Sequence, residues 1–250
     1  MVRRKKSKPP SILLVLPVHN EAAQAPRTGR RIRSFLAKNR HVSLRVVDDG
    51  SDDGTAEAFR LALRGVKNAS VMALPHNGGK GRAVRLGLSG GRHDLWIFMD
   101  GDLAYDFHHL VPMVKALDEH DVVIGSRSMA AQPDGGLPAR RALLGWGFNR
   151  LACVWLGFNY PDTQAGLKGF RRAAGQKLFS KQRLDDFAFD AELLYLARKL
   201  GLTVGQIPAQ VSGFHNYKIS QVKLTLDTLR CLLDFLRIRF WSWTGQYRHP

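Results

Sequence analysis

Short apolar runs alternate with longer amphipathic stretches along the first half of the chain. The runs are rich in valine, isoleucine and leucine, which favour strands, and the stretches between them repeat apolar residues at helical spacing. Strands that alternate with helices predict right-handed βαβ units, so we expect an α/β fold with a mostly parallel sheet flanked by helices. The expected strands are residues 11–18, 42–47, 70–74, 95–99 and 122–125. The expected helices are residues 21–39, 55–66, 80–88 and 108–118.

The second half is less regular. It is expected to contain helices at 138–158, 188–200 and 222–243 and a strand at 203–207. The last helix is amphipathic, with Trp241 and Trp243 near its end. These aromatic residues suit a membrane interface, although core packing would also explain them. We divide the chain into a basic tail (1–10), one α/β domain (11–220) and a C-terminal amphipathic helix (221–250) expected at a membrane interface.

Polar or glycine-rich clusters stand where five of the expected strands end. In an open parallel sheet, ligands bind beyond the carboxyl ends of the strands, so these clusters are expected to meet at one site. The clusters are His19-Asn20-Glu21, Asp48-Asp49-Gly50-Ser51, residues 76–80, residues 100–102 and Ser126-Arg127.

The most informative cluster is the aspartate pair Asp100 and Asp102, one residue apart at the end of an apolar strand. Two carboxylates at a strand tip favour a shared hard cation, Mg²⁺ or Mn²⁺, that binds a diphosphate. The acidic run at 48–55 is also typical of a turn with helix-capping residues. Beside the aspartate pair, it predicts carboxylates that accept hydrogen bonds from a nucleoside.

Basic and acidic side chains complete the candidate chemistry. Lys80 lies among glycines that let backbone N–H groups approach a phosphate, without the Walker A spacing. Arg127 directly follows a strand end, where arginine binds phosphate in bidentate fashion. Asp190 and Glu192 stand in the first turn of an expected helix, where the helix dipole alone favours acidic residues. The alternative is that they contact an acceptor or the metal.

The charge narrows the class of partner. The 250-residue chain has a formal net charge of +17 and a pI near 10.5, which favours anionic partners. No helix-turn-helix, zinc or RNP signature accompanies this charge, so no nucleic acid partner is expected. No apolar stretch reaches the roughly 18 residues that span a bilayer. Cys153 and Cys231 lack CxxC spacing, which indicates buried, reduced thiols. We expect a cytoplasmic protein, peripheral at the inner face of an anionic membrane.

With these motifs in view, the chain resembles family 2 glycosyltransferases of the GT-A fold, and among them the polyprenyl-phosphate sugar transferases. The resemblance covers residues 11–220 and rests on the segments 15–21 and 46–55, with His19 where tyrosine is usual. Ala104 stands where dolichyl-phosphate mannose synthases carry glutamine. The segments 77–81, 162–168 and 189–193 are similar to dolichyl-phosphate glucosyltransferases.

The resemblance implies inverting, metal-dependent transfer of a sugar from a nucleotide-sugar to a polyprenyl phosphate. UDP-glucose is the favoured donor, and GDP-mannose or a hydroxyl acceptor are the alternatives. The implied donor-binding residues are Pro17, His19, Glu21, Asp48, Asp49, Lys80, Asp100 and Gly101. The implied metal ligands are Asp100 and Asp102, and the implied catalytic residues are Asp102, Arg127 and Asp190. The implied contacts to the acceptor phosphate are Arg127, Arg140, Arg141 and Lys218.

Overall fold

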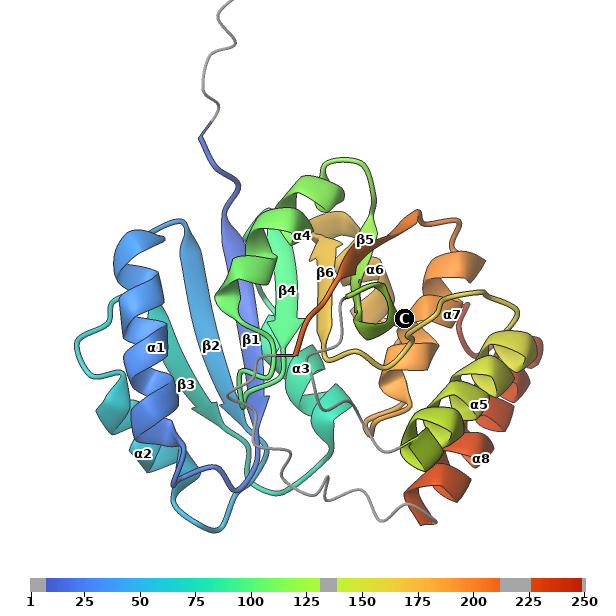
Figure 1. Ribbon diagram of the computed structural model, residues 1–250, viewed down its shortest axis with the longest axis horizontal. Helices are drawn as coiled ribbons and strands as arrows, with labels where there is room; N and C mark the ends of the chain where they lie inside the picture. The colour runs from blue at the N-terminus through green and yellow to red at the C-terminus, as the bar shows by residue number, and fades with distance from the viewer. Residues whose placement is uncertain (1–7, 131–138, 212–225, 249–250) are drawn as a thin grey trace, which may run out of the picture.

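Seven strands form one sheet in the computed structural model, which describes residues 8–130, 139–211 and 226–248 (Figure 1). Their order across the sheet is β3-β2-β1-β4-β6-β5-β7. All neighbours run parallel except β6, which is antiparallel to both β4 and β5. The strands are β1 (Ile12–Val18), β2 (Val42–Asp48), β3 (Ala69–Ala73), β4 (Leu95–Met99), β5 (Val122–Ser126), β6 (Leu167–Arg171) and β7 (Val204–Pro208).

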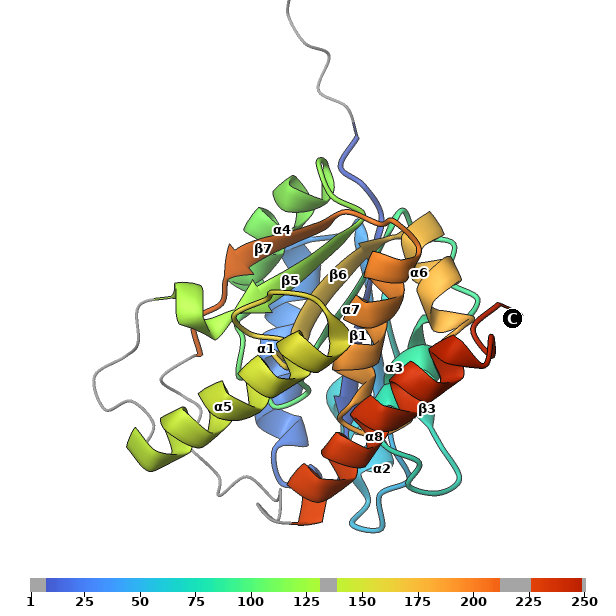
Figure 2. The ribbon, with the colours of Figure 1, turned by 90° about the vertical axis from the view of Figure 1, so that its right-hand side faces the viewer.

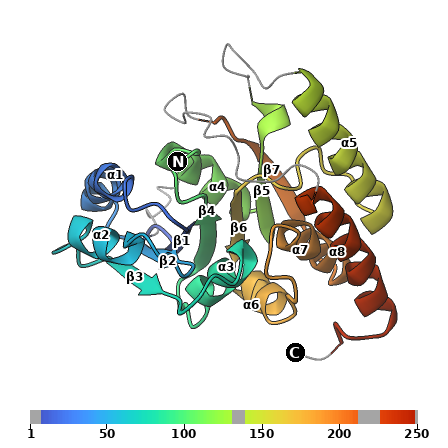
Figure 3. The ribbon, with the colours of Figure 1, turned by 90° about the horizontal axis from the view of Figure 1, so that it is seen from below.

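Helices cover both faces of this sheet, which confirms the expected α/β class. On β1, Leu13 and Val15 pack toward α3, α6 and α7, while Ile12, Leu14 and Leu16 pack toward α1, α2 and α4. This alternation follows from the two-residue period of a strand. Helices α5 and α8 lie outside α7 (Figure 3). The helices are α1 (Ala25–Lys38), α2 (Thr55–Ala62), α3 (Lys80–Leu88), α4 (Leu110–Leu117), α5 (Ala139–Leu156), α6 (Arg172–Phe179), α7 (Phe189–Lys199) and α8 (Leu226–Trp243). Within the described ranges, two single 3₁₀ turns, η1 (Phe107–His109) and η2 (Arg127–Met129), complete the regular elements.

Several expected boundaries were wrong. The first helix begins at Ala25, with Pro26 in its first turn, because residues 21–24 form a turn. The second ends at Ala62, and Gly65 follows at a φ of +82°, where the chain leaves the helix. Strand β6 and helix α6 were not predicted. The strand has no β-branched residue and contains Lys168 and Gly169, so its sequence carries only a weak strand signal.

The parallel strands bring their carboxyl ends to one edge of the sheet, at the bottom of Figure 1. The antiparallel β6 adds the residues that precede it to that same edge, because its amino end lies there. The backbone N–H of Asp100, after β4, donates to the carbonyl of Gly166, before β6, at 2.9 Å. The clusters expected at the strand ends therefore meet residues that no strand-end pattern could have indicated.

Candidate active site

The acidic cluster after β2 is turned inward. Asp48 and Asp49 are both buried. The Asp49 carboxylate accepts hydrogen bonds from the backbone N–H groups of Gly78 (3.0 Å) and Gly79 (2.8 Å), and Asp48 accepts one from the N–H of Ser51. Asp49 thus fixes the glycine-rich loop before α3. This contact ties the predicted nucleoside-binding strand end to the predicted phosphate-binding loop.

Gly79 can form this loop because of its backbone conformation. Its φ is +94°, and a Cβ there would fall 2.5 Å from the carbonyl oxygen of Asp185. Any other residue would meet both strain and a clash. In the same loop, Asn77 Nδ2 lies 3.0 Å from Nε2 of His19. The loop is therefore contacted by residues that follow both β1 and β2.

The remaining predicted donor-binding residues line the tip of β1. The backbone N–H of Glu21 donates a hydrogen bond to the hydroxyl of Thr55 at 2.8 Å, which fixes the position of the Glu21 backbone. Gly101 lies so close to Pro17 that a Cβ would fall 2.3 Å from the Pro17 carbonyl oxygen. The tips of β1 and β4 are consequently in direct contact, as their parallel pairing requires.

The aspartate pair stands at the tip of β4. Asp100 Oδ1 lies 2.7 Å from Nζ of Lys80, and both side chains are partly exposed. Asp102 is exposed, and its Oδ1 accepts the N–H of Ala104 at 2.9 Å. The buried Leu103, which directly follows Asp102, has a backbone φ of +53°, which is uncommon for leucine. A backbone held in that conformation indicates that the surrounding contacts fix the turn.

Gly166 closes one side of this pair. A Cβ at Gly166 would lie 1.9 Å from a carboxylate oxygen of Asp100, so only glycine leaves the carboxylate its place. Two carboxylates supply hard oxygen donors, as Mg²⁺ and Mn²⁺ prefer, and Mg²⁺ commonly takes its other ligands from substrate phosphates and water. Among the described residues, no His, Cys, Asp and Glu side chains form a group of three that could hold a metal. The residues present therefore fit a cation shared between two aspartates and a diphosphate.

The electrostatics favour a permanently charged Lys80. Burial would lower the pKa of Lys80, but the nearby carboxylates of Asp100 and Asp190 outweigh burial and raise that pKa. Lys80 is therefore a stable cation at the aspartate pair. The glycines beside Lys80 had predicted this residue as a phosphate contact.

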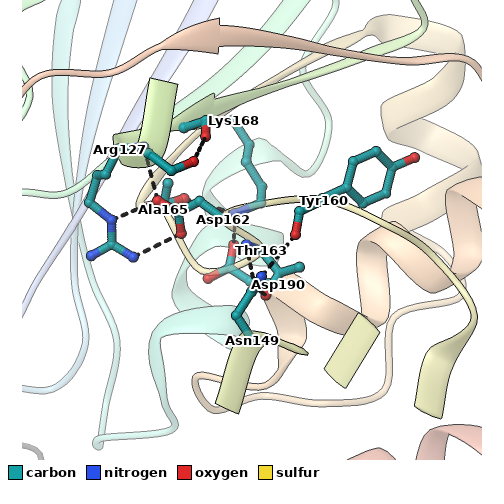
Figure 4. Close-up of polar contacts among 10 residues, drawn as sticks. Arg127, Asn149, Tyr160, Asp162, Thr163, Ala165, Lys168 and Asp190 are labelled. Atoms are coloured by element: carbon teal, nitrogen blue, oxygen red, sulfur yellow. Dashed lines mark hydrogen bonds and ion pairs between the residues drawn. The ribbon is translucent and has the colours of Figure 1, made fainter. Parts of the chain in front are cut away.

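A second ion pair lies completely buried beneath the site (Figure 4). Lys168 Nζ is 2.7 Å from Asp190 Oδ1, and the two side chains are 0% and 3% exposed. The ammonium also donates to the carbonyl of Ala165 at 2.8 Å. Burial lowers the pKa of Lys168, an effect that Asp190 opposes. Asp190 is thus placed as the counter-charge of Lys168, whereas a general base for a hydroxyl acceptor would need access to substrate.

Arg127 is bound by Asp162, for which no role was predicted. Its Nε and one terminal nitrogen donate to the two carboxylate oxygens of Asp162 at 2.7 and 2.8 Å (Figure 4). The backbone N–H of Arg127 donates to Asp162 as well, at 3.0 Å. Burial would raise the pKa of Asp162, but Arg127 outweighs it and holds that pKa below its ordinary value. The Arg127 side chain is still 45% exposed, so the pair orients it and leaves it accessible.

The loop that carries Asp162 is fastened to α5. Asn149 Oδ1 accepts from both the N–H (3.0 Å) and the hydroxyl (2.7 Å) of Thr163, and Asn149 Nδ2 donates to the carbonyl of Tyr160 at 2.9 Å. Only the family resemblance indicated that residues 162–168 matter. Their signal in the sequence is the run of polar residues Asp162-Thr163-Gln164 shortly before β6.

Glu192 proves to be a structural residue. It is fully buried and accepts the backbone N–H of Leu184 at 2.9 Å and the hydroxyl of Tyr247 at 2.7 Å. Burial raises the pKa of Glu192, and these donors oppose the shift. The glutamate joins the segment after α8 to the loop that supports Gly79. The alternative that Glu192 contacts acceptor or metal therefore finds no support in its position.

The other predicted residues are less completely placed. Arg140 and Arg141 lie in the first turn of α5, but their side chains are outside the described part of the structure. Lys218 lies outside the described residues altogether. Cys153 is buried, as expected, whereas Cys231 is only half-buried. In the described portion of the chain, no helix is long and apolar enough to cross a bilayer.

Comparison with known proteins agrees with this geometry. Residues 13–179 match glycosyl transferase family 2. The chain is 29% identical to dolichyl-phosphate beta-glucosyltransferase ALG5D of Trichomonas vaginalis, over 92% of this chain and 75% of that protein. It is 30% identical to the human dolichyl-phosphate beta-glucosyltransferase, over 94% of this chain and 76% of the other.

Solved structures show the same fold at lower identity. Mannosyl-3-phosphoglycerate synthase from Rubrobacter xylanophilus superposes with a TM-score of 0.64 at 20% identity, covering 95% of this chain and 75% of that one. Glucosyl-3-phosphoglycerate synthase from Mycobacterium tuberculosis, in complex with Mn²⁺, UDP and phosphoglyceric acid, gives 0.58 at 22% identity, covering 90% and 78%. Both are glycosyltransferases of the GT-A fold. From its sequence match and its sheet, this chain is a glycosyltransferase and belongs to glycosyltransferase family 2.

Proposed function

We propose that this glycosyltransferase moves glucose from UDP-glucose to a polyprenyl phosphate, with inversion at the anomeric carbon. The observation that carries the proposal is the joint placement of an aspartate pair, Lys80 and an oriented Arg127 at one edge of the sheet. The similarity of the chain to dolichyl-phosphate glucosyltransferases supports the choice of sugar and acceptor. The acceptor class would place the enzyme peripherally at the cytoplasmic face of a membrane.

The nucleoside would lie at the tips of β1 and β2, against Pro17, His19, Glu21, Asp48 and Asp49. Of these residues, His19 and Asp49 contact the glycine-rich loop, and the hydrogen bonds of Asp49 couple the shape of that loop to the strand end. The N–H groups of Gly78 and Gly79 are already bound to Asp49, so the predicted backbone contact to phosphate does not come from these two glycines. Lys80, which directly follows them, supplies a positive charge that suits a diphosphate. A donor bound there would direct its phosphates toward the tip of β4.

The diphosphate would be held by Lys80, the backbone at Gly101, and a cation at Asp100 and Asp102. When bound, Mg²⁺ or Mn²⁺ neutralises charge on the diphosphate as it leaves. Lys80 contributes a second positive charge beside the aspartate pair, at 2.7 Å from Asp100. Asp102, exposed at the turn, is the ligand most directly open to the donor.

A lipid phosphate acceptor agrees with the placement of the basic and acidic groups. Its oxygen is already anionic at neutral pH, so it needs cations for positioning more than it needs a base. Arg127, fixed by Asp162 and still 45% exposed, supplies one cation. Arg140, Arg141 and Lys218 are proposed to supply others. A hydroxyl acceptor would require a base, and the burial of Asp190 against Lys168 speaks against that residue in the role.

The test is sugar transfer by the purified full chain with Mn²⁺, a short polyprenyl phosphate, and either UDP-glucose or GDP-mannose. Transfer from UDP-glucose should disappear with EDTA and return with added Mn²⁺. Asp102→Asn should lose about 100-fold or more of the rate, since metal stabilisation of the leaving group amounts to several kcal/mol. Asp118→Asn is the matched control, an exposed carboxylate at the end of α4. Transfer only from GDP-mannose would show that the donor is GDP-mannose and not UDP-glucose. Equal activity of the Asp102→Asn and Asp118→Asn variants would overturn the metal site.

A further inference from the structure

Helix α8 has apolar residues on two opposite sides. Phe235 and Ile238 are buried against the body of the protein. On the other side, four large apolar side chains face outward: Leu233 (48% exposed), Leu236 (50%), Phe240 (55%) and Trp243 (85%). At about 100° per residue, these four form one stripe centred about 150° from the buried side. An amphipathic helix that only covered a core would carry polar residues there.

Helix α5 repeats this arrangement. Ala152 and Leu156 are buried, while Leu151 (47% exposed), Val154 (69%) and Trp155 (44%) face outward. The two helices contact each other, and the indole N–H of Trp155 donates to the carbonyl of Phe235 on α8 at 3.1 Å. Figure 2 shows both helices lying in front of the sheet on the same side of the molecule. We call the outward residues of α5 and α8 the α5–α8 platform.

Positive charge borders the stripe on α8. At helical spacing, Arg239 lies on one side of the stripe and Arg230 and Arg237 lie on the other, and all three are exposed. On α5, the exposed Arg150 flanks Leu151 and Val154. The chain has a net charge of +17, and its apolar stripe lies between arginines. This pattern is complementary to a lipid bilayer, whose acyl layer is apolar and whose headgroups can be anionic.

We propose that the α5–α8 platform docks onto an anionic lipid bilayer, with its apolar stripe in the acyl boundary and its arginines among the headgroups. A second copy of the chain fits less well, because a symmetric contact would bring arginine-bordered stripes face to face. This docking rests on the proposed function, because a polyprenyl phosphate acceptor would require the enzyme to reach a membrane. Helix α5 follows Arg127 and η2 in the chain and extends toward the edge where the donor loops lie (Figure 1).

The experiment is cosedimentation of the full chain with vesicles of phosphatidylcholine containing phosphatidylglycerol, without donor or acceptor. Leu236→Ser with Phe240→Ser should weaken binding by about tenfold or more for each side chain removed. Leu61→Ser with Val111→Ser is the matched control, because those residues are 73% and 75% exposed on α2 and α4, outside the platform. The control should bind like the unaltered chain. Equal weakening in both variants, or in neither, overturns the proposal.

Two further measurements make the test independent of how one variant folds. Arg239→Gln should weaken binding about fivefold on vesicles that contain phosphatidylglycerol and leave binding to neutral vesicles unchanged. Brominated lipids should quench the emission of the unaltered chain, and Trp243→Phe should lose the largest share of that quenching. Dimerisation without vesicle binding would assign the platform to a second copy. If transfer to a short acceptor persists while vesicle binding fails, the docking is overturned and the proposed function stands.

Discussion

Replacing Lys168 by methionine would leave Asp190 without its charge partner in a place that water does not reach. The two side chains are 0% and 3% exposed and lie 2.7 Å apart, and methionine fills nearly the same volume without the ammonium. Breaking a buried pair by removing one partner costs about 3–5 kcal/mol, since the remaining charge keeps its desolvation penalty. The carbonyl of Ala165 would lose its donor as well. We therefore expect the free energy of unfolding to fall by about 4 kcal/mol.

The assay is urea unfolding at pH 7, followed by circular dichroism. Lys115→Met is the matched control, an exposed lysine on α4 that should change stability by less than about 0.5 kcal/mol. The double variant Lys168→Met/Asp190→Leu removes both charges and should recover most of the loss, because two apolar side chains leave no uncompensated charge. A loss below about 1 kcal/mol in the single variant would refute the reasoning. A double variant as unstable as the single one would do so too.

The opposite single variant, Asp190→Asn, adds a pH dependence. Burial already lowers the pKa of Lys168, and losing Asp190 should lower it further. When the pKa of a lysine is lower in the folded state than in the unfolded state, the unfolded state binds more protons at pH values between the two. The free energy of unfolding therefore rises with pH across that range. The deficit of Asp190→Asn relative to the unaltered chain should therefore shrink as the pH rises from 7 toward about 10. A deficit that grows with pH would contradict this.

Two other substitutions test the contacts around the site. Gly166→Ala puts a Cβ onto the first aspartate of the metal pair and should lower kcat/KM by about 100-fold. Gly147→Ala, which meets nothing within 4 Å, is its control and should be active; equal rates would mean that the turn simply shifts. Tyr247→Phe removes the hydroxyl bound to Glu192 and should cost about 1–2 kcal/mol in thermal unfolding. Tyr195→Phe is its control and should cost less than about 0.5 kcal/mol. If Tyr195→Phe cost more than Tyr247→Phe, the hydrogen bond between Tyr247 and Glu192 would be excluded as a stabilising contact.

Much of the site was predictable because it follows local pattern. The alternation of apolar runs and amphipathic stretches placed β1, β2, β4 and β5 and the clusters at their ends. Parallel pairing then required these clusters to share one edge of the sheet. The pair Asp100 and Asp102, the Lys80 loop and Arg127 were all found in this way. Residues 1–7 and Lys218 fall outside the described residues, so their predicted roles stay predictions.

The sequence by itself determined the strand–helix alternation, the strand ends and the chemistry they carry, since hydrophobic period and turn residues act over a few positions. Only the tertiary structure decided that β6 runs antiparallel between β4 and β5, and that Lys168 on it pairs with Asp190. It also decided that Arg127 meets Asp162, 35 residues away, in a contact that no local pattern encodes. Helical period marked α8 as amphipathic. It could not reveal which apolar side the core would cover, because that depends on the packing of α7 and α5 against it.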